Sequence, residues 1–228
     1  ELAKSVTSLD GVACEGFVMR GSVDETVVKM AEAQDADVLV VGPHRQRPFR
    51  DIFLGTTVDR ILRRSLRPVL IAKRVPAARH HHVLFATDMS DGCTNAIRAA
   101  GNLGLLADAR LSAVHVFAAP GQELMLHASR STKEVLAYIE SERAKATTKL
   151  DAYLKEIGIE ADTRFAELAE VATAETIDGC ARDLKADLIV IGTQARSTIA
   201  RFVLGSVAQG VLRATASDVL VVPPPQAA

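Results

Sequence analysis

The chain repeats itself at a constant distance of 150 residues. The run A-D-V-L-V-V-G at 36–42 recurs as A-D-L-I-V-I-G at 186–192, and L-G-T at 54–56 recurs as L-G-S at 204–206. A fixed offset over this length, without a gap, indicates that one structural unit was duplicated. A chain of 228 residues is also long enough for two ordinary domains. We therefore expect two copies of one fold.

The two copies are unequal in length. By the offset, Glu1 corresponds to Asp151, so the first copy lacks counterparts of everything that precedes Asp151 in the second copy, Asp88 included. We expect a partial first copy over 1–76, a polar linker over 77–82 and a complete second copy over 83–225. Either the start of the first copy was lost, by cleavage or disorder, or the remnant packs on another surface, and we expect the first. A short strand is predicted over 15–19.

Composition excludes several classes of protein. Apolar residues make up 48% of the chain and aromatic residues 4%, which suits aliphatic cores of parallel sheets covered by helices. A net charge of −1 argues against nucleic-acid binding by the whole chain. No apolar run approaches the roughly 18 residues of a membrane helix, and no signal peptide is visible. Scattered cysteines without a C-x-x-C pair predict reduced thiols and a cytoplasmic protein.

The second copy alternates apolar runs with segments of helical periodicity. A capping box at Ser131-x-x-Glu134 predicts the start of a long helix. Alternation of this kind predicts an α/β fold, a doubly wound parallel five-stranded sheet. We expect the strand order 3-2-1-4-5, which alternation alone does not determine. The expected strands cover 83–87, 111–117, 161–168, 187–192 and 218–222.

This strand order predicts where a ligand would bind. Strands one and four are neighbours at the switch point of the sheet, and ligands bind there beyond the carboxyl ends of the strands. Asp88 ends the first strand and Gly192 ends the fourth, so both should border one crevice. The loop after Gly192 reaches a helix through Gly205 and Ser206, and backbone N–H groups and a hydroxyl at a helix start favour an anion. An ordinary strand-to-helix connection is the alternative.

Several motifs of the chain, taken in order, resemble those of the universal stress protein family in its tandem two-domain form. They are A-T-D-M-S at 86–90, the His115-Val116 pair, A-D-L-I-V-I-G-T at 186–193, R-F-V-L-G-S-V at 201–207 and D-V-L-V-V at 218–222. The resemblance covers 83–223 fully and 15–73 as a partial copy. It implies the adenine nucleotide alpha hydrolase-like version of the doubly wound fold and, as in some members, binding of an adenine nucleotide.

The resemblance also implies a set of binding residues. In the family's pattern, two residues separate the first and middle glycines, and nine separate the middle glycine from a final Gly-Ser/Thr; Ala195 stands here where the middle glycine belongs. A methyl group there could crowd a phosphate or be tolerated if φ is negative. Asp88 matches the position that hydrogen-bonds the nucleoside end, and plain core packing is the alternative for Val116 and Ile191. The implied site comprises Thr87, Asp88, Val116, Ile191, Gly192, Ala195, Gly205, Ser206 and Val207, with a weaker set Gly42, Gly55 and Thr56 in the first copy, where Arg45 replaces the middle glycine.

Three functions remain open. The first is a cytoplasmic stress-response protein whose second copy binds ATP as a signal and which acts as a sensor or regulator through dimerisation. The dimer would be a homodimer or an intramolecular pseudo-dimer, with 219–222 as a pairing edge. The alternative is a scaffold of the same fold that binds no nucleotide. An enzyme is not expected, beyond slow ATP hydrolysis, because no G-x-x-x-x-G-K-[ST] loop and no acid–base pair beside a nucleophile is present.

Two polar segments stay outside these functions. The consecutive histidines at 80–82 are more simply a solvated linker than a metal site, so no metal is required, although magnesium could accompany a nucleotide. The basic segment 44–74 could bind an anion or an acidic partner, or be solvated surface. It lacks the interleaved aromatic residues of a single-stranded nucleic-acid platform.

Overall fold

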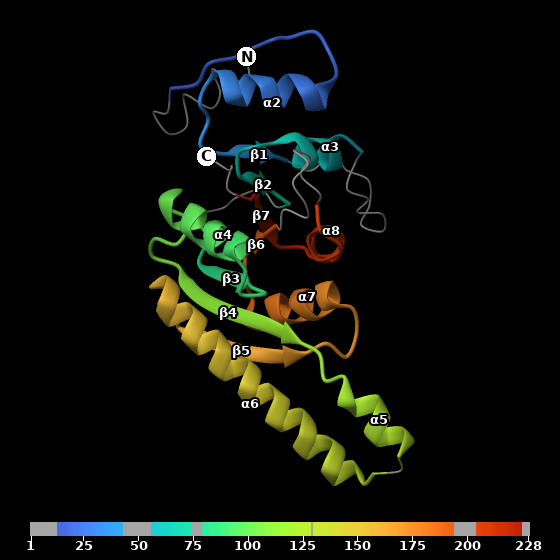
Figure 1. Cartoon of the computed structure of the whole chain (residues 1–228). Coiled ribbons are helices and arrows are strands. Elements are labelled where there is room, and N and C mark those ends of the chain that lie inside the picture. Colours follow the sequence, from blue (N-terminus) through green and yellow to red (C-terminus); the bar gives the residue numbers. More distant parts are fainter. Residues whose placement is uncertain (1–12, 43–55, 74–78, 129, 194–203, 225–228) are drawn as a thin grey trace.

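The computed structural model describes residues 13–42, 56–73, 79–128, 130–193 and 204–224. Within these residues, seven strands form one sheet in the order β1-β2-β7-β6-β3-β4-β5 (Figure 1). The five strands of the second copy are all parallel, and their order is the predicted 3-2-1-4-5. They are β3 (His82–Ala86), β4 (Arg110–Phe117), β5 (Thr163–Leu168), β6 (Leu188–Gly192) and β7 (Asp218–Val222).

The first copy adds two strands to the same sheet. β1 (Leu39–Val41) pairs in parallel with β2 (Val69–Ile71), and β2 pairs antiparallel with β7. The register places Val69 opposite Val221 and Ile71 opposite Val219. Val69 and Val219 are equivalent in the 150-residue repeat, so the last strands of the two copies meet as the equivalent surfaces of a two-fold dimer would. The expected pairing edge of β7 is therefore used within the chain.

The strand expected over 15–19 is wrong. Residues 13–20 form no helix or strand, and the side chains of Phe17, Val18 and Met19 are exposed. By the repeat, this segment corresponds to β5, which is held in the sheet by hydrogen bonds to β4. Among the described residues of the first copy, no equivalent of β4 lies beside the segment. An apolar sequence alone does not make a strand where no neighbouring strand is present.

Helices cover both faces of the sheet. Alternate residues along β3 explain why: Val83 and Phe85 face α4 and α6, whereas Leu84 and Ala86 face α7 and α8. These β3 residues are 5% exposed or less, as buried parallel strands require. The helices are α2 (Val23–Ala33), α3 (Thr56–Arg64), α4 (Asp91–Asn102), α5 (Gly121–His127), α6 (Thr132–Ile157), α7 (Thr173–Leu184) and α8 (Ser206–Ala214).

The predicted capping box is formed at the start of α6. The Ser131 hydroxyl accepts a hydrogen bond from the backbone N–H of Glu134, and the Glu134 carboxylate accepts one from the backbone N–H of Ser131 at 2.9 Å. α6 ends at Gly158, whose φ of 71° is the left-handed conformation that glycine adopts at low cost. Among the helices of the described ranges, none is long and apolar enough to cross a membrane.

Candidate functional site

The expected crevice at the switch point would lie where β3 and β6 end side by side. Ala86 pairs with Ile191 in the sheet, so Asp88 and Gly192 follow at neighbouring strand ends. The first turn of α4 packs directly on the end of β6: a Cβ on Gly192 would lie 2.4 Å from the carbonyl oxygen of Gly92 and 2.6 Å from the backbone nitrogen of Cys93. The contact is between backbones. Gly92 is not among the predicted site residues, and its only signal in the sequence is a glycine four residues after Asp88.

A short turn fixes the backbone around Asp88. Thr87 is buried, and its Oγ1 accepts a hydrogen bond from the backbone N–H of Met89 at 2.8 Å, while Met89 has a φ of 65°. The exposed Asp88 carboxylate accepts two hydrogen bonds on Oδ1, from the backbone N–H of Ser90 at 3.0 Å and from the Cys93 thiol at 3.2 Å. Ser90 caps α4. The carboxylate is thus exposed at the mouth of the crevice on a fixed turn.

The start of α8 borders the same edge of the sheet. α8 connects the carboxyl end of β6 with the parallel strand β7, so its N-terminus lies at the carboxyl edge. Gly205 is the N-cap with φ −63° and ψ 153°, values open to any residue, and no described atom lies within 4 Å of the position of a Cβ there. Ser206 and Val207 in the first turn are exposed. The backbone conformation therefore does not require glycine at 205, and among the described residues no side chain fills the position of a Cβ there.

The remaining predicted site residues fall into three groups. Ile191 is 4% exposed and belongs to the core, as its alternative interpretation proposed. Val116 is half-buried and borders a cavity of about 320 Å³. Ala195 and Gly55 lie outside the described residues; Gly42 directly follows β1, and Thr56 begins α3.

The cavity beside Val116 lies between the carboxyl end of β4 and α6. Its walls combine apolar and basic side chains, including Met89, Phe117, Lys145 and Lys149, and Lys145 is paired with Glu142 at 2.7 Å. His115 also lines it, while its Nδ1 lies 2.9 Å from the carbonyl oxygen of Thr87. The cavity is therefore adjacent to the Asp88 turn.

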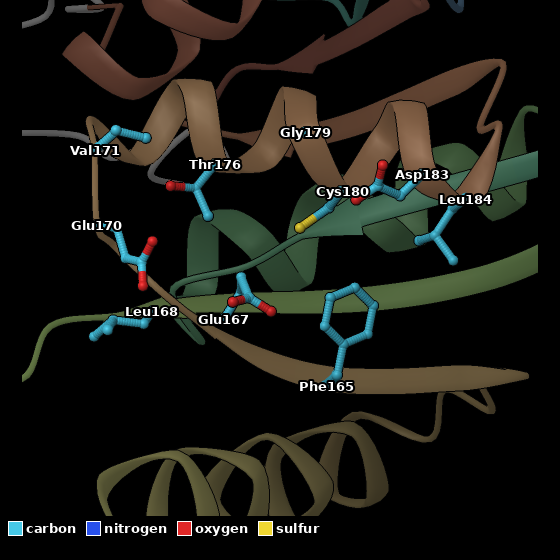
Figure 2. Close-up of a pocket in the computed structure, with 10 residues that line it drawn as sticks. All are labelled: Phe165, Glu167, Leu168, Glu170, Val171, Thr176, Gly179, Cys180, Asp183 and Leu184. Atoms are coloured by element: carbon cyan, nitrogen blue, oxygen red, sulfur yellow. The ribbon is translucent and has the colours of Figure 1, made fainter. Parts of the chain in front are cut away.

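A larger cavity of about 460 Å³ lies elsewhere, between β5 and α7 (Figure 2). The carboxylates of Glu167, Glu170 and Asp183 surround it, and the sulfur of Cys180 points from α7 toward β5. Burial and the nearby charges of Glu167 and Asp183 raise the pKa of the Cys180 thiol to about 11. An acidic lining disfavours a phosphate. None of the predicted binding residues borders this cavity.

The expected solvated linker at 80–82 is wrong for two of the three histidines, because His82 is buried and begins β3 and His80 is half-buried. Nε2 of His80 lies 3.0 Å from Oδ2 of Asp218, and Nε2 of the buried His82 lies 2.8 Å from the hydroxyl of Ser112. The described part of the chain contains no group of three or more His, Cys, Asp or Glu side chains able to hold a metal ion.

Lys73 of the first copy reaches the end of α8. Its ammonium donates hydrogen bonds to the carbonyl oxygens of Leu212 and Thr215, the latter at 2.7 Å, and its backbone N–H donates to Asp218. Burial lowers the pKa of Lys73 to about 8, although Asp178 and Asp218 oppose the shift. A cation at the C-terminus of a helix stabilises the helix dipole. Helix α8 therefore has Ser206 at one end and a residue of the other copy at its other end.

Comparison with known proteins agrees with this architecture. The model of the universal stress protein family matches residues 1–73 and 80–223, and the chain belongs to this family. Universal stress protein MJ0577 of Methanocaldococcus jannaschii is 30% identical over 64 residues, 28% of this chain and 40% of that protein. Universal stress protein MJ0531 of the same organism is 31% identical over 144 residues, 63% of this chain and 82% of that protein. The matched part thus spans less than half of the first relative.

Solved structures show the same fold at low identity. A universal stress protein from Archaeoglobus fulgidus has a TM-score of 0.71 and 19% identity, with 98% of this chain and 76% of that chain covered. A putative universal stress protein from Pseudomonas aeruginosa has a TM-score of 0.70 and 22% identity over the same shares. Both agree with an α/β sheet in tandem arrangement.

Proposed function

We propose that the second copy binds ATP, or a related adenine nucleotide, at the crevice between Asp88 and the start of α8. The observation that carries the proposal is the start of α8, with Gly205 and Ser206 exposed, at the same sheet edge as the exposed Asp88 carboxylate. In this proposal the chain is a cytoplasmic sensor or regulator of the stress response. Its copies, 1–76 and 83–225 joined by 77–82, act as a pseudo-dimer or within a homodimer.

The two ends of a nucleotide suit the two sides of the crevice. Phosphate oxygens would accept hydrogen bonds from the Ser206 hydroxyl and from backbone N–H groups of the first turn of α8, where the helix dipole favours negative charge. The exocyclic amine and the ribose hydroxyls of a nucleoside donate hydrogen bonds, and an ionised Asp88 carboxylate would accept them. The missing Cβ at Gly205, with no described side chain in its place, supports close approach of a phosphate to the backbone. Magnesium could enter with the nucleotide.

The proposed activity is binding, with at most slow ATP hydrolysis. The proposed site uses two polar side chains, those of Asp88 and Ser206. Among the described residues, we find no general acid and base beside the start of α8. A regulator responds to a ligand because the ligand binds one of its conformations more tightly than another. Slow hydrolysis would only return the protein to its ligand-free state.

The test is the mass of any small molecule released from the purified protein by heat denaturation. An adenine nucleotide in near-stoichiometric amount is expected, and added ATP should raise the melting temperature by mass action. Asp88→Asn should reduce the rise in melting temperature that ATP causes. Asp108→Asn is a matched control, because Asp108 is exposed in the loop before β4, at the opposite edge of the sheet.

The competing function is a scaffold that binds no nucleotide. Ala195 in place of the middle glycine favours it, as does the β2–β7 pairing, which joins both copies into one sheet. If no nucleotide is released and ATP leaves the melting temperature unchanged, the nucleotide proposal is wrong and the scaffold is favoured.

A further inference from the structure

We propose that Cys93 is a positioning residue of the nucleotide site, whose thiol holds the Asp88 carboxylate in the orientation that a nucleoside would meet. This inference rests on the proposed function. It adds a residue that neither the repeat nor the family motifs singled out. Its basis is one contact between a buried helix residue and an exposed carboxylate.

The thiol hydrogen is directed at Asp88. The sulfur of Cys93 lies 3.2 Å from Oδ1 of Asp88 and 3.9 Å from the carbonyl oxygen of Ala86, so the carboxylate is the closer acceptor. The same oxygen accepts the backbone N–H of Ser90 at 3.0 Å. Two donors on one oxygen, one from the turn and one from the helix, restrict rotation of the carboxylate.

Cys93 is itself held rigidly. Its side chain is 5% exposed and belongs to the core cluster that includes Phe85, Ala96 and Ile97. Its backbone N–H donates a hydrogen bond to the hydroxyl of Ser90 at 3.4 Å. The same nitrogen lies so close to Gly192 that a Cβ there would be 2.6 Å away. Cys93 therefore contacts both strand ends of the proposed site, through its sulfur at one end and through its backbone at the other.

The local charges keep the thiol protonated. Burial and the negative charge of Asp88 both raise the pKa of Cys93, so the side chain remains an S–H donor at neutral pH. A donor on an ionised carboxylate favours its charged form, which is the form that accepts hydrogen bonds from a nucleoside. Among the described residues, further titratable groups near this turn are Asp91, which follows Ser90 in α4, Tyr153 of α6, which contacts Thr94, and His115 of β4, which contacts Thr87.

The first measurement is ATP affinity by calorimetry on the full chain. Cys93→Ala removes the donor and is expected to weaken binding about three- to tenfold, since a thiol is a weak donor to a charged acceptor. Cys93→Ser keeps a donor and should bind ATP more tightly than Cys93→Ala. Cys180→Ala is the matched control: it removes another buried thiol, far from Asp88 on α7, and should leave the affinity unchanged.

The second measurement needs no nucleotide. A carbon-13 NMR titration of the Asp88 carboxyl group should show a higher midpoint in Cys93→Ala than in the wild type, and no change in Cys180→Ala. An unmoved midpoint, or wild-type ATP affinity in Cys93→Ala, overturns the positioning role. If the midpoint moves but the wild-type protein binds no ATP, the thiol–carboxylate contact is upheld and the proposed function is what has failed.

Discussion

The glycines at the ends of the 192–206 loop differ in what surrounds the missing side chain. At Gly192 a methyl group would meet the backbone of Gly92 and Cys93, and backbone cannot rotate away as a side chain can. At Gly205 no described atom is near, and the backbone angles suit any residue. Gly192 therefore serves the packing of α4 on the sheet, whereas nothing in the described residues requires the missing side chain at Gly205.

Replacing Gly192 should cost stability. Gly192→Ala is expected to destabilise the fold by about 1–3 kcal/mol, because α4 must shift away from β6. Chemical unfolding of the variant and the wild type measures this. Gly179→Ala is the control: beyond its chain neighbours and the helix's own backbone, no described atom lies within 4 Å of a Cβ at this position, so the change should stabilise α7 slightly. Equal stabilities for Gly192→Ala and the wild type would contradict the close contact.

Replacing Gly205 should affect binding more than stability. Gly205→Ala places a methyl group in the space that the proposal assigns to a phosphate, so ATP affinity should fall about tenfold or more. The melting temperature without ATP should change little, because only the loss of a glycine N-cap opposes the variant. Unaltered ATP affinity would show that the phosphates lie elsewhere.

The sequence predicted these positions but not their separate roles. The repeat and the family motifs place Gly192 and Gly205 in one loop, and both were assigned to the nucleotide site. The contact between Gly92 and Gly192 joins residues 100 positions apart, and the Cys93 thiol meets Asp88 only because the turn folds back. Contacts of this kind depend on three-dimensional packing, which periodicity does not encode.

At the scale of elements, the sequence predicted correctly those features whose hydrogen bonds join residues close together in the chain. The capping box of α6 was readable because its two hydrogen bonds join residues three positions apart. The strand expected over 15–19 failed because a strand is completed by hydrogen bonds to another segment. The correspondence of 13–18 with β5 shows that the same unit forms a strand only where β4 is beside it.

The cap of α6 offers a direct test at this scale. Ser131→Ala removes the hydroxyl that accepts the Glu134 N–H and should destabilise the protein by about 1 kcal/mol, measured by thermal unfolding. Ser141→Ala, at an exposed position inside the same helix, should be neutral or slightly stabilising, since alanine is the better helix former. Similar losses for both variants would mean that the cap adds nothing specific.

At the scale of the whole molecule, the alternation of strands and helices predicted the parallel sheet of the second copy, the expected strand order is confirmed, and the pairing edge of β7 was foreseen. The burial of Lys73 was not foreseen. In the sequence, Lys73 begins a polar stretch that leads into the linker, yet its ammonium lies against the end of α8, 139 residues away at Leu212. Only the joining of both copies in one sheet brings these groups together.

Lys73 should give the stability a distinctive dependence on pH. Its pKa is about 8 in the folded protein and ordinarily 10.5, so between these values the unfolded chain binds more protons than the folded one. The free energy of unfolding should therefore rise with pH from about 8 to 10.5, as the cost of a buried charge is relieved. Chemical unfolding at several pH values should show this rise in the wild type and its loss in Lys73→Met. Lys133 is exposed on α6, so Lys133→Met should show the same pH dependence as the wild type. If the free energy of unfolding still rises with pH in Lys73→Met, another group is responsible.

The antiparallel pairing of β2 with β7 reverses the strand direction between the two copies. Strands β1 and β2 run against the other five, so their carboxyl ends lie at the opposite end of the sheet from those of β6 and β7. Gly42 and Gly192, equivalent in the repeat, therefore lie at opposite ends of the sheet. As long as this pairing holds, the two equivalent strand ends cannot become the two walls of a single site.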